Sequence, residues 1–97
     1  MDKLKDITDT IRTNVQLMVD SPQDVIVDCF PTERGASIRI EVAPTDLGKL
    51  IGKQGRTARA LRVLTGAMGM ATKQRISLDI MEQGSGIQPG SPDLSQV

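Results

Sequence analysis

Apolar residues recur at three- and four-residue spacing near the start of the chain, at Leu4, Ile7, Ile11, Val15 and Met18. This spacing is typical of one face of an amphipathic helix, because a helix completes a turn about every 3.6 residues. The pattern predicts a helix over residues 3–19, which Asp2 caps and which the Asp-Ser-Pro sequence at 20–22 ends.

Three later runs have the pattern of β-strands. Residues 25–30 (VIVDCF) are rich in β-branched side chains, and residues 37–42 (SIRIEV) alternate apolar with polar ones. The segment TERG at 32–35 is a turn candidate, so these two runs predict a hairpin. Residues 75–81 (RISLDIM) alternate in the same way and predict a third strand.

Helical signals occupy the segment between the second and third predicted strands. Pro44 ends the second strand, and the sequence TDLGKLI from Thr45 predicts a short helical turn. Gly-Lys-Gln-Gly at 52–55 interrupts it, and apolar spacing over 56–70 predicts a longer helix that ends near Gly69.

The element order α-β-β-α-α-β predicts an α+β fold, a three-stranded sheet with the helices packed on one face. We expect one domain over residues 1–82. Residues 83–97 are rich in Gly, Ser, Pro and Gln and have no period, which predicts a flexible C-terminal tail.

The amino-acid composition limits the kinds of catalytic and metal-binding site that the chain can form. The chain has one cysteine and no histidine, which excludes an internal disulfide, metal sites of the Cys/His kind and His-based catalysis. We therefore expect no enzyme, no cofactor and no bound metal. Neither a signal peptide nor a membrane span is visible, so a cytoplasmic location is expected. Phe30 is the only aromatic residue, so the core must be aliphatic.

The charges sum to zero but are strongly segregated along the chain. Residues 1–46 carry a net charge of −4 and residues 79–97 a net charge of −3. Residues 47–78 carry seven basic side chains and no acidic one. Such a segment is typical of proteins that contact a polyanion.

The basic segment contains the stretch LGKLIGKQGRTARAL at 47–61, which superficially resembles a phosphate-binding P-loop. That motif needs four residues between its first glycine and the Gly-Lys pair, and a hydroxyl residue after the lysine. Here three residues intervene and Gln54 follows Lys53, so no hydroxyl is placed for magnesium. We therefore discount a nucleotide triphosphatase, and the dinucleotide fingerprint G-x-G-x-x-G is absent.

A G-x-x-G turn between two helices is well suited to bind a phosphate of a nucleic-acid backbone. Glycines at 52 and 55 let a sugar-phosphate chain approach the main chain closely. The N–H groups at the start of the following helix attract an anion. Lys53 adds charge at the tip and Gln54 an amide, and basic residues recur along one flank of the helix at Arg56, Arg59 and Arg62.

These residues resemble the KH domain, whose G-x-x-G loop clamps about four nucleotides of single-stranded nucleic acid. The family's aliphatic pair before the loop matches Leu50-Ile51, whereas Ala58 stands where an Ile or Leu is usual. The element order is that of the type II KH fold. The run at 42–62 is similar to small stand-alone bacterial KH proteins of the KhpA type, and the resemblance extends over roughly residues 1–82.

The resemblance implies a cytoplasmic protein that binds single-stranded RNA, as a post-transcriptional regulator or RNA chaperone. It implies association as a homodimer, or as a heterodimer with a longer KhpB-type multidomain KH protein, and a link to cell elongation or division. Leu50 and Ile51 would form one apolar wall of the groove, and the sheet edge opposite, with Ile38 or Ile40, would form the other. The RNA-binding residues expected are Lys49, Leu50, Ile51, Gly52, Lys53, Gln54, Gly55, Arg56, Arg59 and Arg62.

Two alternatives stay open. The chain is a scaffold or partner subunit if its main contacts are with protein, for which Met68 and Met70 near a helix end are candidates. Single-stranded DNA is the other ligand to consider, because only the 2′-hydroxyl distinguishes it from RNA.

Overall fold

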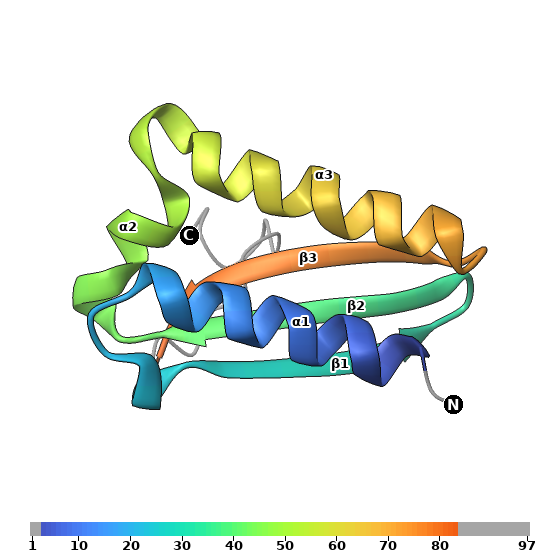
Figure 1. Cartoon of the computed structure of the whole chain (residues 1–97), viewed down its shortest axis with the longest axis horizontal. Helices are drawn as coiled ribbons and strands as arrows, with labels where there is room; N and C mark the ends of the chain where they lie inside the picture. Colours follow the sequence, from blue (N-terminus) through green and yellow to red (C-terminus); the bar gives the residue numbers. More distant parts are fainter. Residues whose placement is uncertain (1–2, 84–97) are drawn as a thin grey trace, which may run out of the picture.

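The computed structural model describes residues 3–83, in which three helices cover one face of a three-stranded sheet (Figure 1). The helices are α1 (Lys3–Met18), α2 (Leu47–Ile51) and α3 (Arg56–Ala71). The strands are β1 (Ile26–Thr32), β2 (Gly35–Val42) and β3 (Arg75–Glu82). The predicted α+β fold and its element order are therefore confirmed.

The sheet has the order β1-β2-β3, so β2 is the central strand. Strands β1 and β2 form an antiparallel hairpin, and β3 runs parallel to β2 with Leu78 opposite Ile38. Helices α2 and α3 make the crossover between the two parallel strands. Figure 1 shows that the α2–α3 connection lies at one end of the molecule and the α3–β3 turn at the other.

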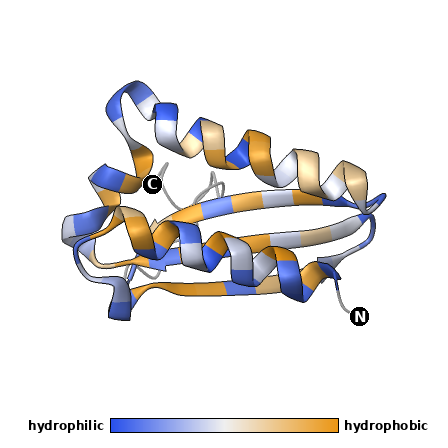
Figure 2. Ribbon diagram, in the orientation of Figure 1, coloured by the Kyte–Doolittle hydropathy of each residue, from blue (hydrophilic) through white to orange (hydrophobic). Residues whose placement is uncertain are grey.

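The core lies between the helices and the sheet and is aliphatic, as the composition requires. Alternate residues of β2 are buried, and Ile11 and Val15 of α1 are fully enclosed against the sheet. Figure 2 shows the matching alternation of hydrophobic and hydrophilic positions along the ribbons. Each such side chain stabilises the fold by about 1.5–3 kcal/mol on burial.

Several element ends differ from the predicted ones by one or two residues, and three of these differences have a clear structural setting. Strand β1 runs past Pro31 to Thr32, because an edge strand tolerates a residue without an N–H. Strand β2 begins earlier, at Gly35, and leaves a turn of only two residues. Helix α3 ends at Ala71, where the Thr72 hydroxyl donates to the carbonyl oxygens of Met68 and Gly69. The predicted Asp2 cap and all of the predicted tail except Gln83 lie outside the described residues.

Asp46 joins the start of α2 to the connection that follows α1. Its side chain is fully buried, and its carboxylate accepts hydrogen bonds from the backbone N–H groups of Asp20 (3.1 Å) and Ser21 (3.0 Å). A buried carboxylate needs such partners, because an unpaired one is strongly destabilising. These hydrogen bonds fix the position of the start of α2, and so of the loop that follows α2, relative to the end of α1.

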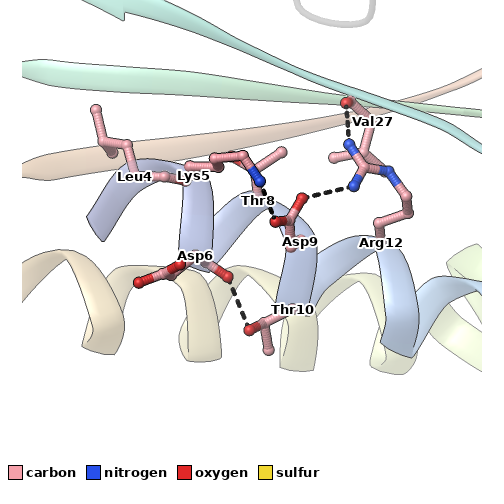
Figure 3. A network of polar contacts seen from close by, with 8 residues as sticks. All are labelled: Leu4, Lys5, Asp6, Thr8, Asp9, Thr10, Arg12 and Val27. Atoms are coloured by element: carbon pink, nitrogen blue, oxygen red, sulfur yellow. Dashed lines mark hydrogen bonds and ion pairs between the residues drawn. The ribbon is translucent and has the colours of Figure 1, made fainter. Parts of the chain in front are cut away.

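Helix α1 is tied to β1 by a polar network at the edge of the sheet (Figure 3). The Asp9 carboxylate accepts hydrogen bonds from Lys5 Nζ (2.9 Å) and Arg12 Nη1 (2.7 Å). Arg12 Nη2 donates to the carbonyl oxygen of Val27 (3.3 Å). The hydrogen bonds from Lys5 and Arg12 hold the pKa of Asp9 below its usual value, and the Asp9 carboxylate raises the pKa of Lys5.

No helix within residues 3–83 has the length and apolar character that crossing a membrane requires.

Candidate nucleic-acid interface

The loop at 52–55 has an unusual backbone. Gly52 (φ 80°), Gln54 (φ 58°) and Gly55 (φ 75°) all adopt positive φ angles. Gly52 ends α2 by donating its N–H to the carbonyl of Gly48 at 2.9 Å, and Gly55 donates to Gly52 at 3.1 Å. Three positive φ angles in four residues reverse the chain sharply between two helices. Glycine is the residue that tolerates this conformation at least cost.

Gly52 and Gly55 have different structural roles. A Cβ atom on Gly52 would collide with Thr57 at the start of α3, so this position requires a glycine for close packing. A Cβ atom on Gly55 would meet nothing within 4 Å, so only the backbone conformation favours glycine there. Gly52 thus closes the loop against α3, and Gly55 leaves its outer surface open.

Lys53 and Gln54 are exposed at the tip of the loop. Arg56 and Arg59 are also exposed, on the first two turns of α3. Arg56 Nη2 donates to Gln54 Oε1 at 3.2 Å, which orients the amide beside the guanidinium. The loop and the helix start therefore present three positive charges together.

The start of α3 adds a backbone contribution. The N–H of Arg56 donates to the carbonyl oxygen of Lys53, whereas the next N–H groups have no partner within the helix, and Gly55, the N-terminal capping residue, offers no side-chain cap. The helix dipole concentrates positive potential at this end. An anion seated at the loop would therefore meet backbone donors as well as the side chains of Lys53 and Arg56.

The structure corrects the expected apolar walls. Leu50 has no exposed surface and belongs to the core, so it supports the loop from beneath and does not face a ligand. Ile51 is half-buried and retains some exposed surface. Ile38 and Ile40 cannot form the opposite wall, because they lie on the central strand and are fully buried.

The edge of the sheet beside α3 is β3. The N–H groups of Arg75 and Gln83 donate to Arg34 and Val42, so odd-numbered residues of β3 turn their backbone groups toward β2 and the hairpin. Backbone groups alternate in direction along a strand, so the even-numbered residues turn theirs toward the open edge. Ile76, Leu78 and Ile80 thus turn their N–H and C=O groups to the edge next to α3, where the Leu78 carbonyl already accepts a hydrogen bond from Arg62. The sequence analysis expected a sheet edge as the second wall but placed Ile38 or Ile40 on it, because the apolar pattern does not give the strand order.

Two of the expected basic residues have partners inside the protein. Lys49 Nζ lies 3.5 Å from the carboxylate of Asp20, which partly neutralises its charge. Arg62 Nε donates to the carbonyl oxygen of Leu78 at 3.3 Å and so lies over the open edge of β3. The basic flank of α3 therefore leads from the loop to that edge.

Within residues 3–83, no group of three or more His, Cys, Asp or Glu side chains gathers where a metal ion would be held.

A chain with the element order α-β-β-α-α-β and a basic G-x-x-G loop between its last two helices has the features of a KH domain. Residues 8–80 match the family model described as KhpA/KhpB, KH domain. This match covers most of the chain, which therefore belongs to the KhpA/KhpB family of KH domains, as the sequence resemblance indicated.

Curated relatives agree with this assignment. The chain is 44% identical over 63 residues to the RNA-binding protein KhpA of Mycobacterium tuberculosis, covering 65% of this chain and 79% of that protein. It is 38% identical over 68 residues to the RNA-binding protein KhpA of Listeria monocytogenes, covering 70% and 90%. It is also 38% identical over 71 residues to the protein of that name from Caldanaerobacter subterraneus, covering 73% and 95%.

Proposed function

We propose that this chain is a non-enzymatic RNA-binding protein that grips the backbone of single-stranded RNA with the Gly52–Gly55 loop. The observation that carries the proposal is the loop itself. Its backbone brings exposed Lys53 and Gln54 to the start of a helix, inside a segment of seven basic and no acidic residues. The relatives named RNA-binding protein KhpA support the choice of ligand.

Phosphate binding follows from electrostatics. A phosphate placed over the loop meets the open surface at Gly55, the N–H groups of the first turn of α3, and Lys53. An anion at a helix N-terminus gains about 0.3–1 kcal/mol from the dipole at an exposed site. Arg56 and Arg59 then meet the next phosphates along the flank of α3.

Bases are held between α3 and the edge of β3. The open N–H and C=O groups of Ile76 and Ile80 bond to base edges, while the Arg62 guanidinium adds donors at the same edge. No aromatic ring is available to stack a base here. Phe30, the only aromatic residue, lies on the other face of the sheet, where the Arg39 guanidinium is 4.8 Å from its ring centroid. We therefore expect weak binding with low sequence specificity.

Weak single sites are commonly strengthened by pairing, because a second linked site raises the effective affinity. Val63, Leu64 and Met70 of α3 are exposed, and Met70 most strongly at 80%. This surface supports association with a second KH domain, either another copy or a KhpB-type protein. Met68, the other methionine considered, instead packs against the core. If this association dominates in the cell, the chain is a scaffold subunit for which RNA is secondary.

We place the proposed activity in the cytoplasm, in RNA chaperoning or post-transcriptional control that affects cell elongation or division.

The test is a double variant, Lys53→Asp with Gln54→Asp, assayed by ultraviolet crosslinking to RNA. We expect crosslinking to be abolished while the circular dichroism spectrum stays that of the wild type. The matched control is Lys3→Asp with Gln23→Asp, which changes the net charge equally at exposed positions away from the loop. If the loop variant crosslinks RNA as well as the wild type does, the proposal is wrong. A single-stranded DNA of the same sequence, run in parallel, decides between the two nucleic acids.

A further inference from the structure

The outer edge of the sheet is formed by β1. The strand order leaves β1 and β3 at the two margins of the sheet, and β3 lies beside α3. Figure 1 shows β1 along the lower margin of the molecule, on the side away from α3. An edge strand carries N–H and C=O groups that no neighbouring strand uses, and these groups are a template for pairing with another chain. A second copy of the chain therefore has an edge at β1 to which it can add as a strand.

The composition of β1 favours such pairing. Residues 25–30 (VIVDCF) are rich in β-branched side chains and contain one acidic residue and no basic one. On the face of the sheet without helices, Ile26 is 40% exposed and Phe30 41% exposed. Short apolar segments with high β-propensity and little charge pair readily with copies of themselves when they lie at an exposed edge. Association through β1 is therefore a hazard for this chain.

Three residues of β1 turn their backbone groups to the open edge, namely Val27, Cys29 and Pro31. The carbonyl oxygen of Val27 accepts a hydrogen bond from Arg12 Nη2 at 3.3 Å, so this carbonyl does not face β2. Backbone groups alternate in direction along a strand, so Cys29 and Pro31 share the direction of Val27. Proline has no N–H to donate. At this edge, therefore, one acceptor is already bonded and one donor is missing.

The bonded acceptor and the missing donor belong to the same hydrogen bond. When two copies pair antiparallel about a twofold axis at Cys29, that residue lies opposite its own counterpart. Val27 of each copy then lies opposite Pro31 of the other, because the two residues are equally far from Cys29. The bond that should run from the N–H of residue 31 to the carbonyl of residue 27 has no donor, and Arg12 occupies its acceptor. The twofold axis repeats this loss on both sides of Cys29.

Arg12 is held at the edge by Asp9. Arg12 Nη1 donates to the Asp9 carboxylate at 2.7 Å, and Lys5 Nζ donates to the same carboxylate at 2.9 Å (Figure 3). The guanidinium is planar and presents several donors, so one nitrogen bonds Asp9 while the other bonds the Val27 carbonyl. Charged side chains and prolines at an edge are two means by which natural sheets avoid edge-to-edge pairing. Both are present here, on neighbouring parts of one edge.

We propose that Arg12 and Pro31 together close the outer edge of β1 against pairing with a second copy of the chain. Arg12 occupies the acceptor and Pro31 removes the donor of one hydrogen bond, so a variant that lacks only one of them still cannot form that bond. Self-association of the native chain then uses a surface other than β1. The proposal does not involve RNA, so its failure would leave the proposed function unaffected.

The experiment uses Cys29 as the reporter of pairing. In the twofold arrangement the two Cys29 side chains lie on the same face of the joined sheets, with Cα atoms about 5.5 Å apart, a separation that a disulfide bridges. The thiol lines a surface cleft of about 590 Å³ between α1 and β1, so a small reagent can reach it. Diamide oxidises two thiols to a disulfide and takes up their two protons and two electrons. Non-reducing electrophoresis then measures the rate at which crosslinked protein forms.

The proteins compared are the wild type, Arg12→Ala, Pro31→Val and the double variant. We expect the double variant to crosslink about ten-fold faster than the wild type at equal concentration, because the hydrogen bonds on both sides of the axis are restored. Each single variant should stay within about two-fold of the wild type, since the bond still lacks one partner. A double variant no faster than the wild type overturns the proposal. A single variant as fast as the double overturns it too, because the two residues would then not act on one bond.

A matched control and a second variant complete the test. Arg34→Ala with Pro44→Ala removes one arginine and one proline at exposed positions away from this edge and should crosslink like the wild type. Equal acceleration in this control overturns the proposal. If circular dichroism shows that the double variant is unfolded, Arg12→Met with Pro31→Val replaces it, because methionine keeps the length of the side chain and has no donor. Light scattering without diamide should show a larger mass for the double variant, and a larger mass without Cys29 crosslinking would place the association elsewhere and overturn the proposal.

Discussion

Gly52 and Thr57 lie so close together that a Cβ atom on the glycine would be 2.8 Å from the backbone nitrogen of Thr57. This contact joins the end of α2 to the first turn of α3 and closes the loop. It also separates the roles of the two loop glycines, because the space around Gly55 is open. The Gly-x-x-G pattern therefore combines one packing requirement with one conformational requirement.

We predict that Gly52→Ala is far more damaging than Gly55→Ala. Gly52 has φ 80° and ψ 172°, a region that is essentially restricted to glycine and costs other residues about 1–3 kcal/mol. The collision with Thr57 adds to that strain. Gly55 lies in the left-handed helical region (φ 75°, ψ 14°), where alanine costs about 1–2 kcal/mol. Urea unfolding of both variants measures the difference, and equal losses of stability would contradict the packing role of Gly52.

A second prediction concerns which basic side chains contribute to RNA binding. Lys49 is paired with Asp20 at 3.5 Å, whereas Arg59 is exposed one turn beyond the start of α3. Arg59→Ala should weaken RNA binding about five-fold and lower the salt slope by about 0.7, as expected for one phosphate contact. Lys49→Ala should change affinity less than about two-fold, since an exposed paired charge contributes little. Titrations at several salt concentrations measure both, and the reverse ranking would contradict the site.

The local elements were predictable from the sequence, because each has a clear period. The spacing of Ile7, Ile11 and Val15 predicted α1, and the alternation through Ile38 and Ile40 predicted β2. What the pattern lacks is strand order. Nothing in the sequence places β2 in the centre and β3 at the edge beside α3, so Ile38 and Ile40 were assigned to a groove wall although they are buried in the core.

The loop shows a similar limit. The glycines and Lys53 were recognised, but Leu50 and Ile51 were treated as one surface. Neighbouring helical residues point about 100° apart, so when Leu50 faces the core Ile51 cannot do so equally. The short α2 has too few residues for a period to decide which one is buried. Asp46 was also missed, because its partners, the N–H groups of Asp20 and Ser21, are about 25 residues away in the chain.

Asp46 supplies a prediction about stability. Asp46→Ala would leave the N–H groups of Asp20 and Ser21 without their acceptor in a partly buried position. An unsatisfied buried donor costs about 1–3 kcal/mol, so we expect a loss of about 2–3 kcal/mol. Urea unfolding with an unchanged denaturant slope would measure it.

The matched control is Asp20→Ala. It retains the backbone N–H that Asp46 accepts and removes only the exposed ion pair with Lys49, so its stability should stay within about 1 kcal/mol of the wild type. An Asp46→Ala variant as stable as the Asp20→Ala variant would show that the buried carboxylate does not hold the connection in place.

The Asp9 network predicts how stability depends on pH. Hydrogen bonds from Lys5 and Arg12 lower the pKa of Asp9 below 3.8, so the folded state favours the carboxylate. The ionised Asp9 carboxylate contributes to the free energy of unfolding above pH 3.8. This contribution is lost as the pH falls through the lower pKa of the folded state. At the alkaline end, the raised pKa of Lys5 keeps the Lys5–Asp9 ion pair intact to above pH 10.5.

Asp9→Asn should therefore be slightly less stable than the wild type at neutral pH and equally stable in strong acid. Unfolding curves measured from pH 2 to 8 would test this, with Asp24→Asn as a control that removes one charge outside the network. A difference that persists unchanged at the acid end would mean that the ion pair is not its source.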